Sequence, residues 1–427
     1  MRWGQAMVVG LLISAGAGVV WADDPSMDGD KAELQVLKAR LEKLEDKVNA
    51  AEASGNSNLS GAVLALPSGL QGVAMSGYVD TAYTYNFNRP DTGVGRTNRG
   101  RVFDVNPNSF TLHAAKLVLE KPLSDSAPVG FRTDLMFGDD AEVIHSTGLG
   151  NVVAGDNPTA FDLQQAYVAV RAPVGNGLDI KLGKFITLLG AEVINSPENW
   201  NYSRSYLFGF AIPFTHTGAL ATYSLGELGS TSFGIVNGWD IADENNSFKT
   251  MLGNVTLTPV KGVTLSTSLI TGAERASDNG NDRTVLDLVA TWQPLEQLTL
   301  MANYDYGHEA SITHGGTTAG RDTGNWSGVA LYAKYAVTDT WSLAGRWEMF
   351  NDMDDVRTAL TGPTGTEVLE GLRLYGYTLT SQWQLYKHLL ARLEYRHDTS
   401  NERVFFNKSS LFRTYQDTVA MEFIAPF

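Results

Sequence analysis

The chain has 427 residues, no cysteine and a formal net charge of −15 at neutral pH. The lack of cysteine excludes a disulfide framework, and the acidic balance argues against a nucleic-acid partner, which requires a basic face. Only 19% of the residues are charged, whereas 43 Gly, 16 Tyr, 18 Phe and 9 Trp make up a composition typical of strands and turns.

The first 22 residues carry the features of a secretory signal peptide. Arg2 precedes an apolar run over 6–20, and the small residue Ala22 stands directly before an acidic stretch. We predict cleavage after Ala22. A membrane-spanning helix is the competing interpretation, but such a helix requires about 20 apolar residues and flanking anchors. No second run of this kind follows, so we expect an exported protein.

Residues 31–53 predict a short coiled coil. Apolar side chains recur there at alternating steps of three and four, at Leu34, Leu37, Leu41, Leu44 and Val48. This is the a/d spacing of helices that associate with each other. A single amphipathic helix lying on the protein's own folded domain is the alternative, although isolated helices of this length are marginally stable in water. The following residues, 54–72, begin with SGNSNLSG, which predicts a flexible linker.

From about residue 73 onward the sequence has a period of two. Runs such as GYVDTAYTY and LLARLEYRH alternate apolar residues with polar or small ones, as strands do. Short connections such as APVGNG alternate with long ones, and the long ones lie at 88–108, 138–160, 188–214, 238–248, 272–282, 307–325, 351–370 and 398–414. The alternation predicts about sixteen antiparallel strands with both chain ends on the short-turn side, which is typical of an outer-membrane barrel.

The last strand, DTVAMEFIAPF, explains why the barrel must close. Alternation places its side chains on two faces. The apolar face carries Val419, Met421, Phe423 and Phe427, and the other face carries Thr418, Ala420 and Glu422. Because a bilayer offers no water to an open sheet edge, this strand must pair with the first one, near 73–87. A soluble β-sandwich or propeller is the competing fold, but uncharged outward faces disfavour it. We predict an all-β fold, a transmembrane antiparallel β-barrel over 73–427, in the bacterial outer membrane with the helix in the periplasm.

One stretch, 183–218, resembles a known family. Its sequence is GKFITLLGAEVINSPENWNYSRSYLFGFAIPFTHTG. It resembles the OmpL-like putative beta-barrel porin family, in which a Gly-Lys-Phe strand end leads to Tyr-Ser-Arg-Ser, then to Pro-Phe and His-Thr-Gly. The resemblance extends over most of 73–427 and implies a bacterial outer-membrane porin. It implies no catalytic residues and no particular solute.

The third long loop, 188–214, is among the longest connections and is rich in polar and aromatic side chains. In sixteen-stranded porins the corresponding loop folds into the lumen and narrows it, so the resemblance implies a constriction here. An external cap and a surface loop without function are the alternatives. Its candidate constriction residues are Glu192, Glu198 and Arg204.

Strand alternation predicts which wall residues face the lumen. If Leu117 and Leu119 face lipid, Lys116 faces water, and a Lys or Arg at mid-depth on the lipid side would cost about 2–4 kcal/mol. The same rule gives as pore-lining candidates Lys116, Arg132, Asp134, Lys181, Lys334, Arg346, Glu348, Arg392, Glu394 and Arg396. In strand 161–171 the alternation of apolar and polar residues is interrupted at Gln164 and Gln165. A β-bulge would explain the interruption.

The sequence contains no motif of a known catalytic class. G-x-S-x-G, H-E-x-x-H and phosphate loops are absent and the seven His residues are scattered. We expect no enzyme activity, no cofactor and no metal site, and we expect the acidic loop clusters to be solvated. We expect passive diffusion of small hydrophilic solutes or ions, contact with outer-membrane lipid, and a homotrimer. The alternative is a non-conducting structural barrel that anchors the envelope through its coiled coil.

Overall fold

The computed structural model describes residues 72–90, 97–149, 160–312, 322–363, 369–408 and 411–427. The predicted signal peptide, the coiled-coil helix and all but the last residue of the linker lie outside the described residues. None of the helices in these ranges combines the length and the hydropathy of a membrane-spanning helix.

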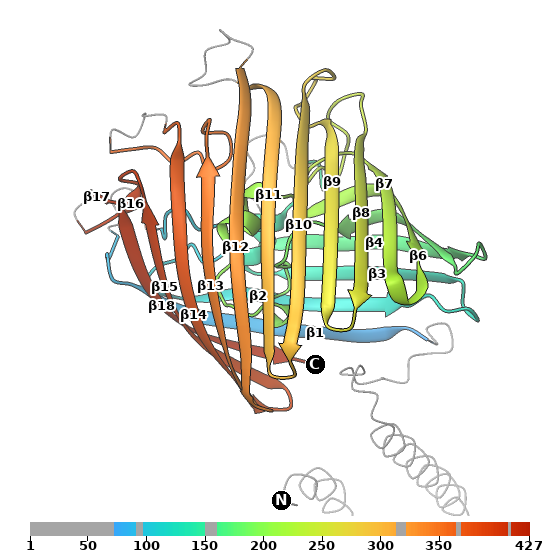
Figure 1. The fold of residues 1–427 in the computed structure, drawn as a ribbon, viewed down its shortest axis with the longest axis horizontal. Helices are drawn as coiled ribbons and strands as arrows, with labels where there is room; N and C mark the ends of the chain where they lie inside the picture. Colours follow the sequence, from blue (N-terminus) through green and yellow to red (C-terminus); the bar gives the residue numbers. More distant parts are fainter. Residues whose placement is uncertain (1–71, 91–96, 150–159, 313–321, 364–368, 409–410) are drawn as a thin grey trace, which may run out of the picture. The chain divides into compact units, whose positions relative to one another are not determined.

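The described chain forms one closed antiparallel barrel of sixteen strands (Figure 1). The barrel strands are β1 (Ala74–Asn86), β2 (Ser109–Lys121), β3 (Val129–Phe137), β4 (Phe161–Ala172), β5 (Leu178–Ile186), β6 (Thr215–Ser224), β7 (Gly229–Val236), β8 (Thr250–Val260), β9 (Val263–Ala273), β10 (Asp282–Leu295), β11 (Leu298–Ile312), β12 (Asp322–Thr338), β13 (Trp341–Asp352), β14 (Leu372–Tyr386), β15 (Leu389–Ser400) and β18 (Tyr415–Pro426). The predicted all-β fold and strand number are therefore confirmed.

Short elements lie in the long connections and in one turn. They are α3 (Asp139–Ile144), η3 (Ser196–Glu198), the π-helical turn η4 (Leu207–Ala211), η5 (Gly226–Leu228) and the two-stranded sheet of β16 (Phe405–Phe406) with β17 (Phe412–Arg413).

The barrel closes between its first and last strands, as predicted. The ladder of β1 and β18 runs from Tyr78 opposite Pro426 to Asn86 opposite Thr418. Beyond it, the backbones of Gly77 and Phe427 exchange hydrogen bonds of 2.9 and 3.1 Å. A Cβ at Gly77 would lie 2.6 Å from the Phe427 ring and 2.1 Å from a backbone oxygen, so the terminal ring requires glycine there.

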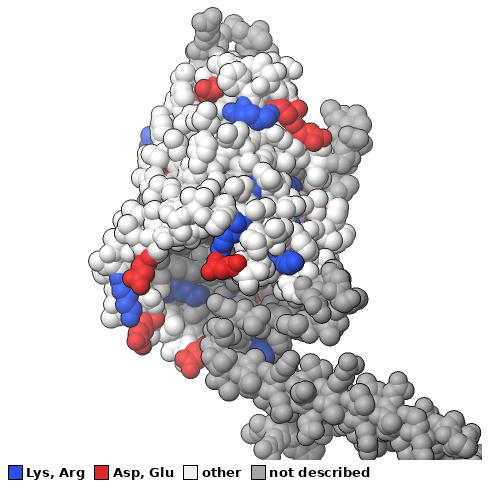
Figure 2. All heavy atoms as spheres, turned by 90° about the vertical axis from the view of Figure 1, so that its right-hand side faces the viewer, with Lys and Arg blue, Asp and Glu red and all other residues white. Residues whose placement is uncertain are grey.

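The barrel wall separates apolar and polar faces along each strand. On β18, Phe423 is 37% exposed, whereas Glu422, its neighbour in sequence, is 1% exposed. Figure 2 shows one face of the molecule on which uncharged residues predominate, as a surface in contact with lipid requires.

Two wall features differ from simple alternation. In β4, Asp134 pairs with Gln165 and Leu135 pairs with Leu163, so Gln164 is the extra residue of a bulge, which confirms the irregularity predicted there. In β2, a register shift makes His113 an extra residue, and its side chain is buried. The sequence did not predict this second bulge.

The long connection predicted at 307–325 is shorter in the structure. Strands β11 and β12 continue to Ile312 and begin at Asp322, and Gly307 pairs with Trp326 in their ladder. A Cβ at Gly307 would lie 1.9 Å from the Trp326 indole. The polar, Gly-containing sequence around residue 307 therefore resembles a loop but forms part of two paired strands. Glycine is required at position 307 because any side chain there would collide with the Trp326 indole.

Candidate functional site

The loop 187–214 leaves the wall between β5 and β6 and reaches the opposite side of the barrel. The Glu394 carboxylate on β15 accepts hydrogen bonds from the backbone N–H groups of Tyr202 (2.7 Å) and Ser203 (3.0 Å). Strands β13 to β15 lie opposite β5 and β6 in the sixteen-strand ring. The loop therefore crosses the barrel interior and does not form an external cap.

Arg204 gives the crossing loop its compact shape. Its guanidinium donates to the carbonyl oxygens of Ile194 (2.7 Å), Tyr202 (2.8 Å) and Val193 (3.0 Å). The Asn199 amide donates to the Val193 carbonyl at 2.7 Å, which joins the same two segments of the loop. These bonds satisfy backbone groups that have no strand partner, as a buried loop requires. Arg204 is thus bonded mainly within the loop.

Apolar contacts fix the ends of the crossing loop. Leu189 and Ile212 belong to the same buried cluster as the inward wall residues Leu252 and Ile270. On the opposite side, Leu207 packs over Gly328 of β12, where a Cβ would lie 2.7 Å from a leucine methyl group.

Arg346 on β13 is the main cationic anchor for the loop. Its guanidinium donates to Glu192 (2.7 Å) and to the Ser203 carbonyl (2.6 Å), both of which belong to the loop. It also pairs with Glu348 on its own strand at 3.0 Å. Glu348 in turn accepts the backbone N–H of Tyr206. The sequence-predicted residues Glu192, Arg346 and Glu348 thus form one network.

Arg392 on β15 holds a second segment of the loop. It donates to the carbonyl oxygens of Asn199 (2.5 Å) and Ser196 (3.1 Å) and pairs with Glu422 of β18 at 2.9 Å. Because all these groups are buried, the loop carbonyls and the carboxylate together replace the water that the guanidinium loses.

Arg396 links the same network to Asp398, Arg101 and Asp104, which were not among the predicted pore-lining residues. It donates to the Arg204 carbonyl at 2.6 Å and pairs with Asp398 at 2.8 Å. Asp398 also accepts from Arg101 at 2.8 Å, and Arg101 bonds Asp104. Asp398 lies two residues after Arg396 on the inward face of β15, so strand alternation could have identified it as a lumen-facing residue. Arg101 and Asp104 lie in the connection between β1 and β2, where no period indicates them.

Lys116, Asp134 and Arg132 form a second group, on β2 and β3. Asp134 lies 2.8 Å from Lys116 and 2.7 Å from Arg132. Lys116 also donates to the Asn195 side chain of the crossing loop at 2.6 Å. Arg132 reaches Glu120 at 3.1 Å, and its side chain is 24% exposed. Within this group, Lys116 supplies the hydrogen bond to the loop.

The remaining candidates make other contacts with the wall and the loop. Lys181 lies 4.8 Å above the Tyr167 ring, and Lys334 lies 5.9 Å from the Trp200 ring. Glu198 is exposed and accepts the Asn195 amide at 2.7 Å within its own loop.

Comparisons with known proteins decide the family. A family model described as Putative beta-barrel porin-2, OmpL-like, matches residues 72–427. The chain belongs to this porin family. A search of curated proteins finds no match.

The porin is also similar to solved outer-membrane barrels. OmpT of Vibrio cholerae is 9% identical with a TM-score of 0.53, covering 85% of this chain and 99% of its own. The channel DcaP of Acinetobacter baumannii is 12% identical with a TM-score of 0.53, covering 83% and 97%. An anion-selective porin from Comamonas acidovorans is 13% identical with a TM-score of 0.55, covering 83% and 99%. At such identities these likenesses show the fold.

A buried relay also positions the crossing loop of the porin. Asp140 lies 3.0 Å from His113 Nδ1, and His113 Nε2 lies 2.8 Å from the Tyr202 hydroxyl, which contacts Thr84 at 3.0 Å. The bulge in β2 turns His113 inward to this position. Sequence reasoning missed the relay because nothing in the sequence marks the bulge.

A neighbouring connection secures the C-terminal end of the crossing loop. The Asp240 carboxylate accepts the backbone N–H groups of Phe214 and Thr215, each at 2.8 Å. Burial raises the pKa of Asp240 to about 6, although these two hydrogen bonds act in the opposite direction. Close by, Arg357 lies 4.5 Å over the Trp239 ring, and its burial lowers its pKa to about 10.

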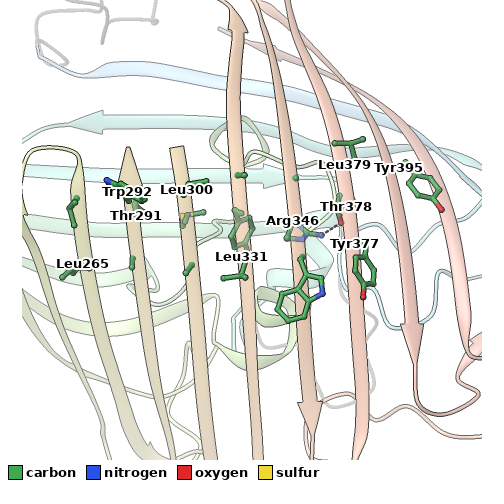
Figure 3. Close-up of a pocket in the computed structure, with 18 residues that line it drawn as sticks. Leu265, Thr291, Trp292, Leu300, Leu331, Arg346, Tyr377, Thr378, Leu379 and Tyr395 are labelled. Carbon is green, nitrogen blue, oxygen red and sulfur yellow. Dashed lines mark hydrogen bonds between the residues drawn. The ribbon is translucent and has the colours of Figure 1, made fainter. Parts of the chain in front are cut away.

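A concavity of about 960 Å³ lies on the outer wall of the porin, across β9 to β15 (Figure 3). Leu331 and Leu379 line it and are 46% and 59% exposed. Arg346 and Thr378, which Figure 3 joins by their 3.3 Å hydrogen bond, are buried. The concavity therefore belongs to the apolar wall that faces the outer membrane.

Proposed function

We propose that this porin is a passive diffusion channel for small hydrophilic solutes or ions, and that the loop 187–214 forms its constriction. The observation that carries the proposal is the anchoring of the loop across the barrel by Arg346, Arg392 and Glu394. Any path through the barrel must pass this loop, so its size and charge select what passes. Gradients drive the movement, and no catalytic step or cofactor is involved.

We assign two roles to the charged candidates. Arg346, Arg392, Arg396, Glu348 and Glu394 are almost fully buried and hold the constriction in place. Arg132, Lys181 and Lys334 are only partly buried, and Glu198 is exposed. We propose that these more accessible groups contact the passing solute.

Swelling of proteoliposomes tests solute passage. Vesicles that contain the folded porin are placed in isotonic neutral sugars of increasing size, with protein-free vesicles as the control. We expect rapid swelling with monosaccharides and slower swelling as the sugar grows. The absence of swelling with a correctly folded barrel would contradict the proposal.

A second candidate function is a plugged structural barrel. The side chains of Arg346 and Arg392, which lie beneath the crossing loop, are 0% exposed, and this favours a tightly packed interior. Vesicles with such a barrel would neither swell nor conduct ions until the loop is removed. The swelling assay and ion conductance together therefore distinguish the two functions.

We also propose that the porin is a homotrimer in contact with outer-membrane lipid. A solved OmpT of Vibrio cholerae with a TM-score of 0.53 is a trimer form, which supports this number. The leucine spacing at 31–53 supports association through a periplasmic helix, after removal of residues 1–22 as a signal peptide. Strand β1 begins on the short-turn side, which in outer-membrane barrels is periplasmic.

A further inference from the structure

Two carboxylates face each other on the inner wall of the porin. Asp287 of β10 lies directly opposite Asp305 of β11 in the antiparallel ladder. Both residues are 0% exposed. Like charges directly opposite each other destabilise a sheet, and a buried charge without a partner is costly. This pair therefore requires something that compensates its charge.

The protein supplies little compensation. Asp287 Oδ2 accepts the Asn303 amide at 2.7 Å. Asp287 Oδ1 and both carboxylate oxygens of Asp305 have no hydrogen-bond donor in the described part of the chain. Within the same residues, no Lys, Arg or His forms an ion pair with either carboxylate. Three buried acceptor oxygens of the pair thus lack a donor in hydrogen-bonding geometry, although the backbone N–H of Gly190 lies close to Asp287 and the Asn303 amide lies close to Asp305.

Neutral oxygen atoms occupy neighbouring positions of the wall and of the crossing loop. Ser268 of β9 lies opposite Asp287, and its hydroxyl donates to the Leu188 carbonyl at 3.1 Å. The Asn303 side-chain oxygen accepts the Ala191 N–H at 3.4 Å. Leu188 and Ala191 belong to the start of the crossing loop. The pair therefore lies where the loop first meets the wall of β9 to β11.

We propose that Asp287 and Asp305 bind one Ca²⁺ ion. A shared proton would join one oxygen of each residue and leave one negative charge in the buried pair, whereas a bound divalent cation neutralises both charges. Ca²⁺ takes six to eight oxygen ligands in flexible geometry, including carboxylate, amide, backbone carbonyl and water oxygens.

Neutral ligands are required at this site. Among the described residues, no group of three or more His, Cys, Asp or Glu side chains is arranged to hold a metal ion. The Ser268 hydroxyl and the Leu188 carbonyl are the neutral protein oxygens available to complete the shell together with water, because the Asn303 amide nitrogen faces Asp287 and its oxygen faces Ala191. The bound ion then ties the start of the crossing loop to the wall.

Calcium binding to the intact porin in detergent tests the proposal. The protein is treated with EDTA, dialysed against Ca²⁺ and analysed for bound metal, and its unfolding temperature is measured with and without Ca²⁺. The test variant is Asp287→Asn with Asp305→Asn, which keeps the side-chain shape and removes both charges. The matched control is Asp282→Asn, which changes an exposed residue on the same strand.

We expect the wild type and D282N to bind one more Ca²⁺ per barrel than the double variant, and only these two to gain thermal stability from Ca²⁺. Equal binding by wild type and double variant would place the ion elsewhere and overturn the proposal. Wild-type protein that binds no Ca²⁺ would also overturn it, in favour of a shared proton. If the double variant does not fold, the single variant Asp305→Asn takes its place in the same comparison.

Discussion

Glu394 on β15 accepts the backbone N–H of Tyr202 at 2.7 Å, although the two residues are 192 positions apart. The same carboxylate accepts the Ser203 N–H at 3.0 Å. Glu394→Gln replaces one acceptor oxygen by an amide donor, so one buried N–H loses its partner. An unsatisfied buried donor costs about 1–3 kcal/mol. We predict that E394Q lowers the free energy of unfolding by about this amount and increases current fluctuations in bilayers.

The control for this substitution is Glu402→Gln, because Glu402 is exposed. Urea unfolding and single-channel recording of both variants measure the two effects. If E394Q and E402Q have the same free energy of unfolding and the same current fluctuations, the contact between Glu394 and the loop does not hold the loop in place.

The closed ladder of sixteen strands predicts resistance to unfolding in detergent, because no strand edge is open to initiate it. The mature protein should migrate faster on a gel before boiling than after boiling. Circular dichroism should show mainly β-structure. A mainly helical spectrum, or a folded protein that stays in solution without detergent, would contradict the fold.

The buried carboxyl group of Asp240 should make the free energy of unfolding depend on pH. Because burial raises its pKa from 3.8 in the unfolded chain to about 6, the folded state binds its proton more tightly. Its contribution is therefore fully present below about pH 4 and is lost as the pH rises through about 6. At about 1.4 kcal/mol per pKa unit, the loss approaches about 3 kcal/mol.

Asp240→Asn stays neutral and keeps an acceptor oxygen, so it isolates this effect. We predict that the stability of the wild type relative to D240N falls as the pH rises from 4 to 7. Urea unfolding of both proteins across this range measures the difference. A difference that does not change with pH would show that Asp240 is not held in its neutral form.

The leucine seam at 31–53 predicts that association depends partly on the helix. Replacing Leu37 and Leu41 by Asp places charges in the apolar seam, where they lose hydration and gain no partner. Association should weaken while each barrel stays folded. Cross-linking and native mass measurement of this double variant decide the matter. An unaltered trimer would make the helix incidental, and a monomeric parent protein would refute the trimer.

Much of the barrel was predictable because strand alternation is a local signal. The period of two around Lys116 and Glu394 places their side chains opposite lipid-facing neighbours, and both are buried inside the barrel. The pairing of the last strand with the first followed from the need to close the sheet.

The contacts across the barrel were not predictable in the same way. The bonds from Arg346 to Ser203 and from Arg392 to Asn199 join residues more than a hundred positions apart. These contacts form only because the loop adopts the compact conformation that the hydrogen bonds of Arg204 stabilise. The alternation of residues along a strand carries no information about that conformation. His113 was missed for a related reason, because a single inserted residue reverses which face a side chain occupies.

Single-channel conductance of the wild type and of a variant lacking residues 192–202 tests the central claim most directly. The narrowest section of a pore sets its resistance, so removal of this part of the crossing loop should widen the path. We predict that the wild type conducts and that the deletion variant, with an intact barrel by gel shift, conducts more. Equal conductance of the two barrels would contradict a constriction at this loop, and a folded but silent wild type would contradict passive diffusion.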